Sequence, residues 1–216
     1  RLFSEFLLRI PTPLTGVLFV RVLTEHTGGI GPWSPDEILF CWGFSEAAVG
    51  MYHLLAMGIG RIPAEYGRTQ ELERILLRPI HPLWLILQEH FSPAELGNLS
   101  VALGMMLMGG RSVPRPLWLL LPVQLLSATA ILFSIQLVLA TLGLLLGTGR
   151  GGADLVLRLS LGARVPPEAL PGGARWLLLP LGFTGFYAAA LFTSQEEWQL
   201  FSLLTLPFSI CLCFLA

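Results

Sequence analysis

The chain has 216 residues, of which 54% are hydrophobic and only 12% are charged. Because soluble proteins average about 25% charged residues, this composition excludes a water-soluble globular protein, and its many apolar side chains exclude a disordered one. The net charge of −1 gives nucleic acid no general attraction. The composition therefore indicates an all-α, polytopic integral membrane protein.

The chain contains no lysine, because all thirteen of its basic residues are arginine. A phosphate-binding Walker A loop requires a lysine, and so does a Schiff-base enzyme. Any ATP hydrolysis that drives this protein is therefore expected on another chain. The four histidines also lack the H-x-x-x-H spacing of many zinc sites. We expect no catalytic residue, no metal and no cofactor.

Long apolar runs recur along the chain, and a membrane-spanning helix needs about 20 such residues. Arg9 and two prolines interrupt the first run, which is expected to contain a short interfacial helix leading into a span. The fourth run exceeds one bilayer thickness and is expected to tilt, protrude or kink at Pro122. The sequence predicts a single transmembrane domain over residues 1–216 with about six spans: 5–24, 37–60, 95–110, 117–147, 176–193 and 200–216.

The second span has a clear start signal in Ser34-Pro35-Asp36-Glu37. Ser34 is a good helix cap, and Pro35 suits the first helical turn. The two acidic side chains that follow face the positive end of the helix dipole. A helix is therefore predicted to begin at this point.

The distribution of arginine predicts the orientation in the membrane. Segments 61–94 and 148–175 hold eight of the thirteen arginines, and positive charge accumulates on the cytoplasmic side of membrane proteins. We therefore expect both segments in the cytoplasm. Arg111 and Arg115 fall on the outer side in this arrangement.

Residues 69–90 form the most helix-like polar segment of the chain. Thr69 is a candidate cap, while Pro79 and Pro82 stop or bend the helix. An apolar face groups three residues at helical spacing: Leu72, Ile75 and Leu76. A charged face groups three others: Glu71, Arg74 and Arg78. The pattern fits either a short amphipathic helix that receives force from a soluble partner or a charged connector without a partner.

The stretch from Gln70 to Pro79 resembles the G-E-L-D-x-x-L-x-R-P signature of bacterial ABC-2 type permeases, in the ATP-binding-cassette exporter superfamily. Two of its positions depart from the signature, with Gln70 in place of Gly and Glu73 in place of Asp. Further stretches resemble the family in the same order, over nearly the whole chain: Gly29–Ser34, Glu37–Phe40, His81–Leu83, Glu95–Gly97, Arg164–Pro166, Pro171, Pro180–Phe183 and Phe186-Tyr187. Ala188 replaces a proline that is common in the family.

The resemblance implies a multi-pass permease subunit of an exporter in the bacterial inner membrane. It implies pairing with a second copy or a related permease, and binding of separate cytoplasmic ATPase subunits whose closure tilts the spans. It also implies a set of ATPase-docking residues: Glu71, Leu72, Glu73, Arg74, Leu77, Arg78 and Pro79.

Glu46 and His53 lie within the second predicted span, and their seven-residue spacing puts them on one helix face. A carboxylate at bilayer depth costs about 2.5–3.5 kcal/mol on insertion scales, so it is expected to face protein or water. The two residues fit a substrate path or a hydrogen bond to a neighbouring helix. The same two residues also fit an alternative function from a different class of protein. In that alternative the chain is a proton-coupled secondary transporter, with Glu46 and His53 as the proton-coupling pair.

Overall fold

The computed structural model describes residues 2–29, 33–66, 71–113 and 118–147, and every regular element among them is helical. The predicted spans 176–193 and 200–216 and segment 148–175 lie outside the described residues. The longer helices are α1 (Leu2–Arg9), α2 (Pro11–Thr27), α3 (Pro35–Ala56), α7 (Leu96–Gly109) and α8 (Leu121–Leu145). The shorter elements are η1 (Ile59–Arg61), α4 (Ile62–Glu65), α5 (Glu71–Leu76), α6 (Pro82–Glu89), η2 (Pro93–Glu95) and η3 (Gly110–Ser112).

Three helical stretches in the described part of the chain are long and apolar enough to cross a membrane: Phe3–Thr27, Pro35–Ala56 and Leu121–Leu145. They overlap the first, second and fourth predicted spans. Helix α7 lies within the third predicted span but has only 14 residues, a length of about 21 Å at 1.5 Å per residue. It extends further only through the tight turns η2 and η3 at its two ends.

The N-terminal helices α1 and α2 meet at Ile10, where Pro11 begins the second of them. The break is small, because Ile10 keeps helical backbone angles and its carbonyl accepts a bond from Leu14. Helix α2 ends at Gly28, whose backbone is left-handed (φ 69°) and whose N–H bonds to the Thr24 carbonyl. Glycine adopts this conformation without steric cost, which explains the helix end.

The predicted start of α3 is confirmed in atomic detail. The Ser34 hydroxyl accepts a hydrogen bond from the Glu37 N–H, and the Glu37 carboxylate accepts one from the Ser34 N–H at 2.8 Å. This reciprocal pair satisfies two of the exposed donors at the helix start. The rest of α3 is the most buried long helix, with Phe40 and Phe44 at the centre of the core.

Helix α7 packs antiparallel along α3, and glycines set the short distance between them. A Cβ atom added at Gly43 of α3 would lie 2.8 Å from the Met105 Cβ and 2.9 Å from the Ala102 carbonyl oxygen. At the other end, Gly109 rests on the backbone of Asp36 and Phe40. Gly109 of the third predicted span thus serves packing within the chain.

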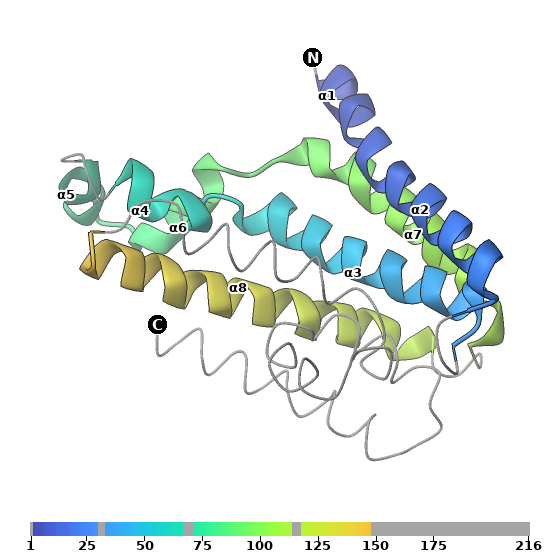
Figure 1. Cartoon of the computed structure of the whole chain (residues 1–216). Helices are drawn as coiled ribbons and strands as arrows, with labels where there is room; N and C mark the ends of the chain where they lie inside the picture. Colours follow the sequence, from blue (N-terminus) through green and yellow to red (C-terminus); the bar gives the residue numbers. More distant parts are fainter. Residues whose placement is uncertain (1, 30–32, 67–70, 114–117, 148–216) are drawn as a thin grey trace.

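Helix α8 runs beside α3 toward the end where α4, α5 and α6 gather (Figure 1). It begins at Leu121 with Pro122 in its first turn. Of the three alternatives for the fourth run, the structure excludes a kink at Pro122, because a proline in the first helical turn interrupts no hydrogen bond. Several hydroxyls inside α8 donate to carbonyls four residues back, as Ser127 does to Val123 and Ser134 to Ala130. These bonds satisfy polar groups that an apolar environment would leave unsolvated.

Candidate functional site

Residues 69–90 contain two separate helices, α5 and α6, and the break between them includes Pro79, one of the two prolines predicted to stop or bend the helix. Helix α5 stops at Leu76, and Pro82 opens α6. The physical reason is the spacing of Pro79 and Pro82, since a proline ring excludes a continuous helix. The predicted cap Thr69 lies outside the described residues.

The end of α5 is strongly exposed. Leu77 is 84% exposed and Leu76 is 60% exposed, whereas Ile75 is buried. Of the predicted apolar face, Ile75 is therefore buried and Leu76 is exposed. A helix of six residues has fewer than two turns, and Ile75 is the buried apolar residue among its described side chains.

The charged residues around these leucines are also accessible. The side chains of Glu73, Arg74, Arg78 and Pro79 are all exposed. Glu71 and Leu72 lie in the first turn of α5, and their side chains are outside the described part of the structure. The described candidate docking residues thus form one accessible surface at the end of α5.

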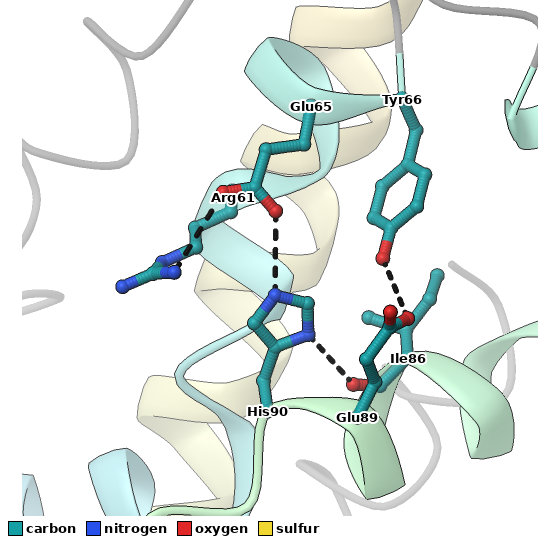
Figure 2. A network of polar contacts seen from close by, with 6 residues as sticks. All are labelled: Arg61, Glu65, Tyr66, Ile86, Glu89 and His90. Atoms are coloured by element: carbon teal, nitrogen blue, oxygen red, sulfur yellow. Dashed lines mark hydrogen bonds and ion pairs between the residues drawn. The ribbon is translucent and has the colours of Figure 1, made fainter.

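A polar network fastens α4 to the end of α6 (Figure 2). The His90 Nε2 atom lies 3.3 Å from the Glu65 carboxylate, which also lies 3.7 Å from the Arg61 guanidinium. The Tyr66 hydroxyl donates to the Glu89 carboxylate at 3.1 Å. Because Tyr66 is buried and its partner is exposed, this bond ties the interior of the bundle to its surface.

The same region is fastened to the last turn of α3. The Ser92 N–H donates to the Leu54 carbonyl at 3.2 Å. The His90 ring lies directly against Gly58, where an added Cβ would be 2.6 Å from the ring carbon Cγ. Together with the covalent link through η1 and α4, these contacts hold the α4–α6 segment to α3 at both of its ends.

Glu46 and His53 line one cavity of about 520 Å³. Helix α3 contributes one face to it, through Trp42, Glu46, Val49 and His53. These positions follow the three- and four-residue spacing of a single helical face. The two candidate residues of the second predicted span are therefore brought to the same space, although they stand about 10 Å apart along the helix.

The opposite walls of this cavity come from distant parts of the chain. Arg9 at the end of α1 pairs with Glu95 of η2, with 3.3 Å between Nη1 and Oε1. The Arg9 side chain is 46% exposed and the Glu95 side chain only 2%. Both residues line the cavity, as does Asn98 of α7.

The family model described as ABC-2 family transporter protein matches residues 11–216. The chain belongs to this family. No curated protein and no solved structure matches it. As an ABC-2 permease it is a membrane transport component, in agreement with its helical architecture and its apolar helices.

Two features that hold the polar sites of this ABC-2 permease together were not predicted from its sequence: the Arg9–Glu95 pair and the contacts between α4 and α6. In the sequence, Arg9 stands out only as an interruption of the first span, and Glu95 only as part of a family-like stretch. The four-residue spacing of Arg61 and Glu65 was a visible signal for an ion pair on one helix face. The pairing of Tyr66 with Glu89 had no such signal, because 23 residues separate them.

Proposed function

We propose that this permease is the membrane-spanning subunit of an ATP-driven exporter, and that a separate cytoplasmic ATPase moves it. A second copy or a related permease completes the pathway in the bacterial inner membrane. The family match supports the transport role. The lack of lysine supports placing ATP hydrolysis on another chain.

The accessible end of α5 is the observation that carries the docking proposal. Leu76 and Leu77 are exposed side by side and are flanked by Glu73, Arg74 and Arg78. An exposed apolar centre with a charged rim is typical of a protein-binding surface. We assign ATPase docking to seven residues of this segment: Glu71, Leu72, Glu73, Arg74, Leu77, Arg78 and Pro79.

The contacts behind this surface support the transmission of force. A push on α5 reaches α4 and α6, which the Glu65–His90 and Tyr66–Glu89 contacts hold together. From there it reaches the last turn of α3 through the Ser92–Leu54 hydrogen bond. ATP-dependent closure of the ATPase pair then shifts the spans between two arrangements, because the ATPase binds one arrangement better than the other.

The test is co-purification of the permease with its ATPase and ATP-dependent transport in vesicles. We expect Leu77→Glu and the double variant Glu71→Arg with Arg78→Glu to lose ATPase association while membrane insertion is retained. Leu119→Glu is the matched control, since Leu119 is 81% exposed and lies just before α8, at the opposite end. Recovery of the ATPase at wild-type yield with the α5 variants would refute docking at this surface.

The same vesicles decide between ATP-driven export and proton-coupled transport. ATP-driven export requires that cargo movement stops when nucleotide is removed. Accumulation of cargo by the permease alone, driven by a proton gradient and abolished by Glu46→Gln, would instead establish the secondary transporter.

A further inference from the structure

A second cavity lies at the end of the helix bundle opposite to α5. The end of α2, the first turn of α3 and the turn η3 after α7 meet there (Figure 1). Two candidate membrane spans reach their ends beside it, because Phe3–Thr27 stops and Pro35–Ala56 begins at this level. The cavity therefore lies where spans leave the hydrocarbon core and meet the lipid headgroups.

The size and lining of this cavity suit a small, highly polar group. Its volume is about 210 Å³, whereas pockets for drug-sized ligands measure about 300–1,000 Å³. Its lining includes two guanidinium and two carboxyl groups, all on exposed residues: Arg21, Glu25, Asp36 and Arg111. Among the residues that the structure describes, no ion pair joins any two of these four side chains. Both kinds of group can therefore bind a ligand in the cavity.

The two arginines favour a phosphate. Arg21 belongs to α2 and Arg111 to η3, yet both line this cavity. Arginine keeps its charge in proteins, and its planar group binds phosphate oxygens in pairs. In the orientation predicted from the arginine distribution, Arg111 falls on the outer side, against the usual preference of arginine for the cytoplasm. A lipid phosphate held at this place explains why an arginine is useful there.

The two carboxyl groups favour a ligand that also carries hydrogen-bond donors. Glu25 lies one turn after Arg21 on α2, and Asp36 lies in the first turn of α3. Carboxylate oxygens accept hydrogen bonds from a primary ammonium, which has three N–H donors. A quaternary ammonium has none, and a glycerol headgroup has no positive charge. A headgroup with both a phosphate and a primary ammonium therefore matches the lining best.

One face of α2 shows the same order of groups as a lipid leaflet. Leu14, Leu18, Arg21 and Glu25 follow one another at helical spacing, and all four are exposed. The two leucines precede the two charged residues, as acyl chains precede the headgroup in a bilayer. The acyl chains of a lipid whose headgroup occupies the cavity can therefore lie against this face.

We infer that the cavity binds the headgroup of a zwitterionic phospholipid. Arg21 and Arg111 hold its phosphate, and Glu25 and Asp36 accept hydrogen bonds from its primary ammonium. Its acyl chains lie along the exposed leucines of α2. Binding of this lipid requires neither the ATPase nor cargo, so the inference stands apart from the proposed export function.

The experiment titrates the purified, delipidated chain in detergent with dioleoyl phosphatidylethanolamine, phosphatidylcholine or phosphatidylglycerol. Native mass spectrometry counts the bound lipids. The three lipids share their acyl chains and differ only in the headgroup. We expect phosphatidylethanolamine to bind at least about tenfold more tightly than either of the others. Equal binding of the three lipids would overturn the inference.

Variants assign the binding to this cavity. Arg21→Gln and Arg111→Gln each remove one phosphate ligand from an exposed position and are expected to weaken phosphatidylethanolamine binding about tenfold or more. His26→Gln is the control, since His26 is also exposed in the last turn of α2 but is not among the described residues that line the cavity. It is expected to bind as the wild type does. Unchanged affinity in both arginine variants would refute the site.

The carboxyl groups are tested by selectivity, because a ratio of two affinities does not depend on how much of the protein is folded. We expect the double variant Glu25→Gln with Asp36→Asn to bind phosphatidylethanolamine and phosphatidylcholine within about twofold of each other. A full tenfold preference for phosphatidylethanolamine in this variant would contradict the inference.

A soluble phosphate ester is the competing source of the same chemistry. Glycerophosphoethanolamine carries the headgroup without the acyl chains. We expect it to bind at least about tenfold more weakly than the whole lipid, because it makes no contact with Leu14 and Leu18. Equal affinity of the two compounds would assign the cavity to a soluble ligand and overturn the proposal.

Discussion

The close contact between α3 and α7 predicts opposite effects on stability for alanine substitutions at two glycines of α7. Gly109 lies against the α3 backbone, where an added Cβ would be 2.6 Å from the Phe40 nitrogen and would collide with the Asp36 carbonyl. Gly104, five residues earlier, has no atom of the described residues within 4 Å of such a Cβ. Gly109→Ala is therefore expected to separate the helices, and Gly104→Ala to leave them in place.

The magnitude follows from the geometry. An ordinary Cβ contact is at least 3.4 Å, so α7 must move away from Phe40 by about 0.8 Å. A gap of about 0.5–1 Å forfeits a quarter to a half of the dispersion energy of the contacts across it. Overpacking of this kind costs about 1–3 kcal/mol, and no side-chain rotation relieves it because the obstructing atoms are backbone. Gly104→Ala should instead gain up to about 1 kcal/mol of helix propensity.

The assay is the midpoint of thermal unfolding of the purified protein in one detergent. For a chain of this size, 1 kcal/mol corresponds to a shift of about 2–4 °C. We expect Gly109→Ala to melt several degrees below the wild type and Gly104→Ala at or above it. Equal midpoints for the two variants would show that α7 does not approach α3 at Gly109.

Two further predictions concern hydrogen bonds. Tyr66→Phe removes the bond to Glu89 and is expected to cost about 1 kcal/mol; it should also lower the amount of cargo exported per ATP while ATPase association is retained. Undiminished coupling in this variant would exclude the Tyr66 link from force transmission. Ser34→Ala removes the cap of α3 and is expected to cost about 1 kcal/mol in the same melting assay. An unchanged midpoint would show that Glu37 or water replaces the cap.

The features that were predictable from the sequence are local ones. The Ser34–Glu37 capping box needs only a four-residue pattern and the dipole of the helix that follows. The common face of Glu46 and His53 follows from helical periodicity alone. The helical class follows from composition, because long apolar runs in a membrane must satisfy their own backbone hydrogen bonds.

The features that were not predictable depend on where distant segments meet. Periodicity placed Ile75 and Leu76 on one apolar face, yet packing buries only Ile75. The pairing of Arg9 with Glu95 joins α1 to the start of α7, and no spacing rule connects residues so far apart. The backbone carbonyl of Phe6 lies against Gly97, so the close approach of α1 to α7 is what brings this ion pair together.

Helix α3 connects the proposed docking surface with the cavity that Glu46 and His53 line. The hydrogen bond from Ser92 ends on Leu54, the residue after His53, which lines the cavity. A displacement of the α4–α6 segment that moves this bond therefore also moves a wall of the cavity. Coupling between two binding events is reciprocal. A cargo molecule held in this cavity therefore changes the affinity of α5 for the ATPase by the same factor as the ATPase changes the affinity for the cargo. Titrations of the ATPase onto the permease with and without a transported compound measure that factor, and a ratio of one would show that the two sites act independently.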